Sequence, residues 1–332
     1  MLFYKGDAAE DPFHPIYSDS KWLYPYEGPV RDFPFILDLE TTNHCNLDCV
    51  FCSRQLITSK LGRIATDTFR RIVDEAAAHG AAVRLNGWGE PFIHTEIVEQ
   101  IRYAHARGCL TMIYTNGTLL TEAKAEALIE AGLDEMKFSM QGLNKHQYEE
   151  MREGATYEKF RGQVKLMHEV RERRGARRPF ITLLTSVITK DWLEETPEAY
   201  RDEWFAYVDK LAIDHTVFTF VEELARVKKY LPYHAVERTY VPCANIAIML
   251  SLNWKGDILI CNQDYDADPH YVLGNLRDMT IHEAWHSPKM NAQREAVGRG
   301  LRHAEFRLCR VCYPNTKKYD GLKVALREPG KR

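Results

Sequence analysis

The amino-acid sequence predicts an α/β protein: a partial barrel of six parallel strands, followed by a small C-terminal domain made of a β-hairpin and a helix. Short apolar runs alternate with stretches that have apolar residues at helical spacing, and this alternation is typical of a parallel sheet with right-handed crossovers. A partial barrel fits better than a flat doubly wound sheet, although periodicity alone does not separate the two. Gly80, Gly108 and Gly132 each follow a helical stretch, where C-caps are expected. In addition, seven of the eight cysteines fall into two groups, one in each region.

The barrel elements follow one another in a regular order along the chain. The predicted strands span 35–41, 82–86, 110–115, 135–140, 181–188 and 208–214. The predicted helices span 66–79, 95–107, 121–131, 157–174 and 194–206. Beyond them, residues 246–252 and 258–261 flank the turn Lys255-Gly256-Asp257 and indicate a β-hairpin, and a helix is expected over 280–297.

This reading divides the chain into five parts. An irregular arm rich in aromatic residues and proline precedes the barrel, and a helix with a linker separates the barrel from the C-terminal domain. The last residues are polar and basic and should form a frayed tail. The expected parts are the arm at 1–34, the barrel at 35–215, the linker at 216–241, the C-terminal domain at 242–315 and the tail at 316–332.

Composition excludes several classes of function. The 332 residues carry 44 Lys and Arg against 47 Asp and Glu, a net charge of −3, and no basic block suggests a nucleic-acid partner. The N-terminus does not resemble a signal peptide, and no apolar run approaches the roughly 20 residues that span a bilayer. We therefore expect a cytoplasmic protein without a membrane partner. In that reducing compartment, clustered cysteines favour metal binding over disulfides.

The two cysteine groups predict two different metal sites. Cys45, Cys49 and Cys52 follow the first strand, at the end where parallel α/β folds place their sites. Three thiolates leave one iron of a four-iron cluster open, and an open metal position allows chemistry. The second group has four members, which would close a cluster and suit electron transfer. These are Cys243, Cys261, Cys309 and Cys312. Zinc is the alternative for both groups.

The first group resembles the signature of the radical S-adenosylmethionine (SAM) superfamily, because Phe51 directly precedes the last cysteine of the triplet. In that family the open iron binds the amino and carboxylate groups of SAM, and the reduced cluster cleaves SAM to a 5′-deoxyadenosyl radical. The resemblance implies that the triplet holds the catalytic cluster and that Phe51 lies near the adenine.

Other strand ends resemble the SAM-binding positions of the family. The residues from Asn86 to Pro91 resemble its Gly-Gly-Glu motif, which implies that Gly87 and Gly89 allow close backbone approach and that Glu90 pairs with the SAM ammonium. Polar side chains at the next strand ends resemble ribose- and methionine-binding positions, and an arginine resembles the partner of the SAM carboxylate. These further positions are Thr115, Asn116, Ser139, Gln141 and the weaker candidate Ser186, with Arg152 as the arginine. A solvated arginine is the alternative for Arg152.

The C-terminal group resembles the auxiliary-cluster module called a twitch domain, a shortened form of the SPASM module. The features are Gly256 before Cys261, the run Leu273-Gly274-Asn275-Leu276 and the final pair Cys309 and Cys312. The resemblance implies one auxiliary cluster, hence two 4Fe–4S clusters and SAM as cofactors. A zinc ribbon remains the alternative, because four thiolates also satisfy tetrahedral zinc.

Within this resemblance the sequence favours a dehydrogenase. The last four cysteines are separated by 17, 47 and 2 residues, which is similar to the aminocyclitol dehydrogenase of butirosin biosynthesis. That similarity implies an oxidoreductase of antibiotic biosynthesis that oxidises a secondary alcohol of a sugar or aminocyclitol, with the auxiliary cluster as electron acceptor. An external reductant, flavodoxin or ferredoxin, is expected. Asp214 and His215, at the end of the sixth strand, are expected to touch the substrate, and either could accept its hydroxyl proton. A solvated strand-end loop is the alternative for both.

Three other functions remain open. An epimerase would need a hydrogen donor, often a thiol, but the eighth cysteine, Cys109, opens the third strand at the opposite end and is expected to fill core. A tyrosine could serve as the donor instead. A peptide-modifying enzyme often carries an N-terminal winged-helix region, for which residues 1–34 are too few and too irregular. A non-enzymatic electron carrier or zinc scaffold would not need the SAM-like motifs.

Overall fold

Six parallel strands form the centre of the molecule. The computed structural model describes residues 2–18, 29–187, 197–215, 226, 243, 245–299 and 307–310. Its strands form one ten-stranded sheet in the order β1-β7-β6-β5-β4-β3-β2-β8-β9-β10. The parallel strands that confirm the predicted barrel are β2 (Ile36–Leu39), β3 (Ala82–Leu85), β4 (Thr111–Thr115), β5 (Glu135–Gln141), β6 (Phe180–Val187) and β7 (Lys210–His215).

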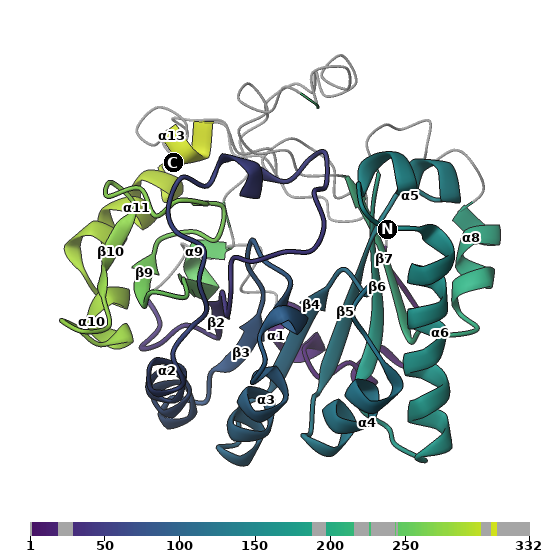
Figure 1. The fold of residues 1–332 in the computed structure, drawn as a ribbon. Coiled ribbons are helices and arrows are strands. Elements are labelled where there is room, and N and C mark those ends of the chain that lie inside the picture. Colours follow the sequence, from purple (N-terminus) through teal and green to yellow (C-terminus); the bar gives the residue numbers. More distant parts are fainter. Residues whose placement is uncertain are drawn as a thin grey trace.

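Helices cover the outer face of this sheet (Figure 1). The five predicted helices are present as α2 (Thr66–Ala78), α3 (Ile97–Ala106), α4 (Glu122–Glu130), α6 (Tyr157–Arg173) and α8 (Pro197–Trp204). The glycines expected at C-caps do adopt positive φ, 65° at Gly80, 80° at Gly108 and 82° at Gly132. One further helix, α5 (Lys145–Met151), was not predicted; it begins where the Asn144 side chain accepts a hydrogen bond from Gln147 N.

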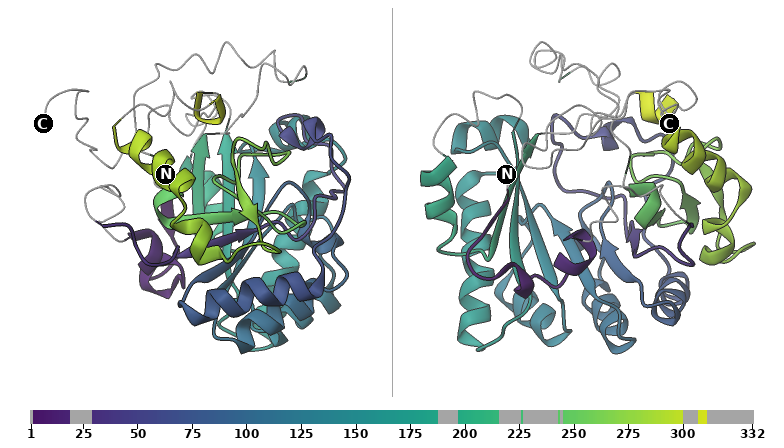
Figure 2. Two further views of the ribbon diagram at one scale, coloured as in Figure 1. Left: turned by 90° about the vertical axis from the view of Figure 1, so that its left-hand side faces the viewer. Right: turned by 180° about the vertical axis from the view of Figure 1, so that it is seen from behind.

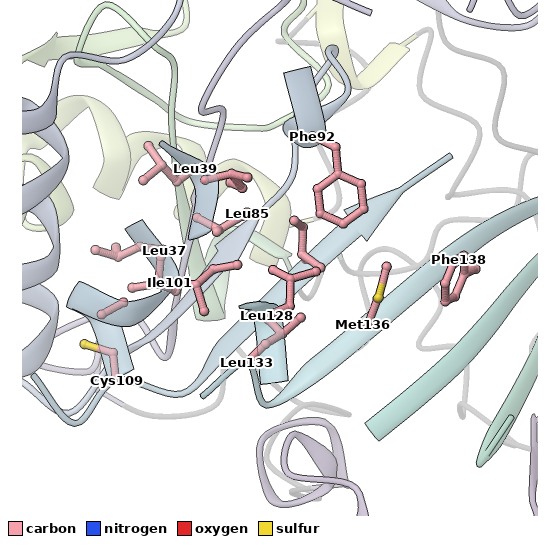
Figure 3. Packing of buried hydrophobic residues seen from close by; sticks show 14 of the residues in the cluster. Leu37, Leu39, Leu85, Phe92, Ile101, Cys109, Leu128, Leu133, Met136 and Phe138 are labelled. Carbon is pink, nitrogen blue, oxygen red and sulfur yellow. The ribbon is translucent and has the colours of Figure 1, made fainter. Parts of the chain in front are cut away.

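The two faces of the sheet differ because side chains alternate along a strand. Odd-numbered positions on β2 and β3, such as Leu37 and Leu85, and even-numbered ones on β5, such as Met136 and Phe138, belong to the apolar core beneath the helices (Figure 3). The intervening positions face the concave side. There the parallel strands carry buried charged side chains, namely Asp38, Arg84, Glu135, Lys137 and Lys210.

The N-terminal arm is more ordered than the sequence suggested. β1 (Leu2–Tyr4) pairs antiparallel with β7, and the short helices η1 (Ala8–Glu10) and α1 (His14–Ser18) follow (Figure 2). Phe13 is fully buried in a second apolar cluster with Ile36 and Met112. Pairing with β7 and burial of Phe13 therefore pack this segment of the arm on the barrel.

The C-terminal residues extend the barrel sheet. β8 (Met249–Leu252) pairs in parallel with β2, and β9 (Asp257–Leu259) and β10 (Val272–Asn275) continue the sheet in antiparallel pairs. The predicted hairpin is thus present as β8 and β9. Its first strand begins later than expected, because 245–248 forms the short helix α9 (Asn245–Ile248).

The single helix expected over 280–297 is two helices, so that prediction was wrong. α10 (Ile281–Trp285) ends before Ser287, which caps α11 (Pro288–Gly298) by accepting a hydrogen bond from Met290 N. Pro288 occupies the first position of α11, where it lacks the N–H that would continue the preceding helix. We call the described residues from 243 to 310, which end in α13 (Arg307–Arg310), the C-terminal module.

Two parts of the sequence prediction lie outside the described residues: the linker helix within 216–241, of which only Arg226 is described, and the tail. Among the helices that the structure describes, none has the length and apolar character needed to cross a membrane.

Candidate active site

The cysteine triplet lies in a loop between β2 and the short helix η3 (Ser53–Leu56). The end of α5 and the residues after it form backbone hydrogen bonds with this loop. Asp48 N donates to Glu153 O and Val50 N to Met151 O, both at 3.0 Å. Arg226 pairs with Asp48 and Glu153, so the part of the chain after β7 also reaches this loop.

The described thiols are not arranged as zinc ligands. Among the described residues, the cysteines form no group of three whose sulfur atoms lie within 4.8 Å of one another. Thiolates on tetrahedral zinc, with bonds of about 2.3 Å, would lie about 3.8 Å apart. Burial raises the pKa of the Cys45 and Cys49 thiols and raises that of Cys52 to about 12. Metal loading must therefore displace protons from these thiols.

The Gly87–Glu90 turn packs directly on the chain around the triplet. A Cβ atom at Gly89 would lie 2.2 Å from Thr42 O and 2.6 Å from His44 O, and one at Gly87 would lie 2.7 Å from Glu40 Cβ. All three distances are far below van der Waals contact. Gly87 and Gly89 are thus in close contact with Glu40 and with the backbone around the triplet, and the approach to the ligand expected at these glycines stays a prediction.

Glu90 joins three loops at the end of the barrel. Its amide N–H donates to His44 O at 2.7 Å. Its carboxylate accepts hydrogen bonds from Phe92 N (3.1 Å), Thr115 Oγ1 (2.8 Å) and Asn116 N (2.7 Å). The side chain is 2% exposed, and burial raises its pKa. Glu90 is therefore a junction of the fold, and its pairing with the SAM ammonium stays a prediction.

Asn116 connects the end of β4 with the cysteine loop. Its Nδ2 donates to Asn46 Oδ1 at 3.0 Å and lies 3.9 Å from Cys45 Sγ. Its Oδ1 accepts from both the backbone and the hydroxyl of Thr118. A donor to a ligating sulfur can tune a cluster, so Asn116 has a structural role beside the predicted contact with SAM.

Arg152 is buried, so the alternative of a solvated arginine was wrong. Its side chain is 5% exposed, and the guanidinium carbon lies 5.7 Å from the ring centroid of Phe51 and 5.9 Å from that of Tyr148. Among the described atoms, Arg152 Nε has no hydrogen-bond partner. A buried, incompletely paired guanidinium beside the cysteine loop is suited to an anionic group such as a carboxylate.

Further predicted residues occupy paired positions on three neighbouring strands. Gln141 on β5 lies opposite Ser186 on β6, which lies opposite Asp214 on β7. Ser139 is two residues before Gln141 and faces the same side, because side chains alternate. His215 ends β7; the side chains of Asp214 and His215 lie outside what the structure describes.

The second cysteine group spans the C-terminal module. Cys243 precedes α9, Cys261 follows β9 and Cys309 lies in α13, each half-buried. Cys261 Sγ accepts a hydrogen bond from Gln263 N at 3.5 Å. Cys312 lies outside the described residues.

A hollow that sequence reasoning missed lies between the concave face and the C-terminal module. Burial raises the pKa of Glu40 to about 7 and that of Asp264 to about 6, and among the described atoms Asp264 Oδ2 has no partner. The sequence contained a signal for this hollow, because one charged residue interrupts the apolar residues of β2 and another interrupts those of β3. Residues that line the hollow include Glu40, Asn86, Trp88, Asn262, Asp264 and Tyr265.

Comparison with known families agrees with this arrangement. Residues 39–202 match the radical SAM superfamily, and residues 243–313 match the SPASM iron–sulfur cluster-binding domain. The chain combines a radical SAM domain with a SPASM domain. A radical SAM domain implies a 4Fe–4S cluster and SAM, and a SPASM domain implies additional iron–sulfur clusters. The thiols described here suit those groups.

Known relatives differ in what they act on. The chain is 26% identical over 293 residues to the tungsten-containing aldehyde ferredoxin oxidoreductase cofactor-modifying protein of Pyrococcus furiosus, covering 76% of this chain and 81% of that one. It is 40% identical over 111 residues to the PqqA peptide cyclase of Ruegeria pomeroyi, covering 33% of this chain and only 29% of the cyclase.

The fold is similar to that of BtrN, solved with AdoMet and 2-DOIA. The TM-score is 0.56 at 17% identity, over 84% of this chain and 93% of BtrN. At this identity the comparison shows a shared fold. The expected radical SAM partial barrel with a C-terminal auxiliary module is thereby confirmed.

Proposed function

We propose that this radical SAM protein is an oxidoreductase that converts a secondary alcohol of a sugar or aminocyclitol intermediate to a ketone. The position of Cys109 carries the choice of dehydrogenation over epimerisation. An epimerase must return a hydrogen atom to carbon. Cys109 is 4% exposed, its Sγ lies 3.8 Å from Val73 O, and it packs beneath the helices (Figure 3). The other seven cysteines belong to the two proposed ligand groups.

The protein's own residues would bind SAM, orient the alcohol and remove one proton. When bound, SAM at the open cluster would supply hydrogen abstraction from carbon, and a cluster held by the second cysteine group would supply an acceptor for one electron. Arg152 is placed to hold a carboxylate beside the cysteine loop. Asp214 or His215 would accept the hydroxyl proton, since both titrate below neutrality when unperturbed. Loss of a hydrogen atom, a proton and an electron completes the two-electron oxidation.

The hollow beside Glu40 and Asp264, with a volume of about 30 Å³, is too small to enclose a sugar, but its polar groups would lie beside one bound at its mouth. The hollow lies between the Gly87–Trp88 turn and the part of the C-terminal module next to Cys261. Carboxyl groups at this position can accept hydrogen bonds from hydroxyl or ammonium groups. Gln141 and Ser186 are on the same concave side of the sheet, and Asp214 pairs with Ser186 in the strand register.

Isotope labelling tests the reaction. Each turnover should consume one SAM and yield one 5′-deoxyadenosine and one ketone, with no solvent deuterium on the reacting carbon. The Cys109→Ala variant should give the same product, and alanine at both Asp214 and His215 should abolish turnover. A product of unchanged mass with one solvent-derived hydrogen would establish epimerisation instead. Turnover with either flavodoxin or ferredoxin as the external reductant would test the expected electron source.

Peptide modification is the second candidate, because the radical SAM domain is similar to part of a PqqA peptide cyclase. A gene for a short precursor peptide beside this gene, and a mass change in that peptide on incubation with SAM and reductant, would favour it over alcohol oxidation.

A further inference from the structure

Three histidines and one aspartate lie together at the protein surface, and none of them belongs to the cysteine loop. Asp32 precedes β2, His79 follows α2, His282 lies in α10 and His286 follows it. The N-terminal segment, the barrel and the C-terminal module thus each contribute at least one side chain. The Asp32 side chain is 78% exposed and that of His282 is 42% exposed, so the group is open to solvent.

The donor atoms are spaced like the ligands of one metal ion. Asp32 Oδ1 lies 3.3 Å from His282 Nε2. Among the described residues, Asp32, His282 and His286 form the one group of three possible ligands whose donor atoms all lie within 4.8 Å of one another. Tetrahedral zinc with bonds of about 2.0–2.1 Å would hold its ligand atoms about 3.3 Å apart. Imidazole nitrogen and carboxylate oxygen are both zinc ligands.

The surroundings orient these side chains as they do at metal sites. A histidine ligand usually donates its other ring N–H to a carbonyl or a carboxylate. His286 Nε2 lies 2.8 Å from Asp32 O, so the backbone of residue 32 orients this ring. His79 Nδ1 lies 3.3 Å from the second carboxylate oxygen, Asp32 Oδ2, and the His79 ring stacks on Phe33 at 4.2 Å.

The start of α10 is fixed independently. The Glu75 carboxylate, on α2, accepts hydrogen bonds from Ile281 N at 3.1 Å and His282 N at 2.9 Å. The helix that carries His282 is therefore docked on the barrel through its own backbone. Preorganised donors lose less freedom when they bind an ion.

We propose that Asp32, His282 and His286 bind a Zn²⁺ ion, with His79 holding the second oxygen of Asp32. The ion would join the N-terminal segment and the barrel to the C-terminal module, on a face separate from the cysteines. This site is independent of the substrate and of the alcohol oxidation proposed above.

Zinc uptake by the tag-free, cluster-loaded protein tests the site. We expect one Zn²⁺ per chain in equilibrium dialysis, and X-ray absorption should show only nitrogen and oxygen ligands at about 2.0–2.1 Å. Asp32→Ala and His282→Gln should each abolish this uptake, whereas His79→Ala should weaken it about 10- to 100-fold. His270→Ala is the matched control, because His270 also contacts an aspartate, with Nδ1 2.8 Å from Asp268 Oδ1. This substitution should leave the zinc uptake unchanged.

Equal zinc uptake by the wild type and both ligand variants would overturn the proposal, as would sulfur in the zinc shell, since either places the ion elsewhere. Unchanged iron content and circular dichroism would show that a variant has folded. If Asp32→Ala fails that check, His286→Gln replaces it, with the same expected loss.

Discussion

The side-chain amide of Gln293 donates a hydrogen bond to Cys309 Sγ over 3.4 Å. Gln293 is 2% exposed, and its Oε1 has no partner among the described atoms. The sulfur is an acceptor, so the NH₂ group must face it. A donor to a ligating sulfur stabilises the extra negative charge of a reduced cluster and so raises the reduction potential.

We therefore expect Gln293→Leu to lower the reduction potential of the auxiliary cluster without loss of iron. Redox titration followed by electron paramagnetic resonance measures this potential. Gln100→Leu is the control, because Gln100 is also buried but contacts His94. A potential equal to that of the wild type would show that the contact does not tune the cluster.

Glu90→Gln should weaken SAM binding about 10- to 100-fold if the carboxylate pairs with the SAM ammonium. The structure adds a second effect. An amide in place of either carboxylate oxygen would face a donor, so the free energy of unfolding should fall by about 1–3 kcal/mol. Calorimetric SAM titration and chemical denaturation measure the two effects.

Thr115→Val separates these two roles of Glu90. It removes one hydrogen bond to the carboxylate and leaves the charge in place, so it should lower stability with a smaller effect on SAM affinity. If Glu90→Gln and Thr115→Val weaken SAM binding equally, Glu90 acts through the fold of the loop.

Anaerobically reconstituted protein should contain about eight irons and eight sulfides, as expected for two four-iron clusters. Replacing Cys45, Cys49 and Cys52 with Ala should leave about half the iron and abolish SAM cleavage. Cys109→Ala should leave the iron content unchanged. Zinc in the second cysteine group of protein purified without oxygen would contradict the proposed electron acceptor.

Glu40 should make stability depend on pH. Burial raises its pKa in the folded protein to about 7, above the ordinary value of 4.5, so the folded state holds its proton over a range where the unfolded state loses it. Stability should therefore fall as the pH rises from about 4.5 to about 7, by at most about 3 kcal/mol, and stay lowered above that range.

Glu40→Gln should remove the fall in stability with rising pH that is due to Glu40. The Gln side chain keeps an oxygen that can accept the hydrogen bond from Trp88 N. Urea denaturation at pH 5 and pH 8 would give the difference. Glu169→Gln, at a side chain that is 55% exposed, should retain the pH dependence of the wild type. The same slope in Glu40→Gln and the wild type would mean that another group titrates.

Much of the fold and of the cysteine pattern could be predicted because local sequence encodes them. The six parallel strands appear as apolar runs at regular intervals, and glycines mark the helix ends. The triplet from Cys45 to Cys52 needs only eight residues, so its spacing is readable without a structure. The division into SAM-binding and auxiliary regions followed from the same local patterns.

Only the tertiary structure decided what depends on distant parts of the chain. It buried Arg152 beside Phe51, placed the backbone of Thr42 and His44 against Gly89, and added β8 to the edge of β2. It also brought His282 to Asp32, 250 residues earlier in the chain. Spacing along a strand or helix reports only near neighbours, whereas these contacts form when the sheet and the C-terminal module close on one another.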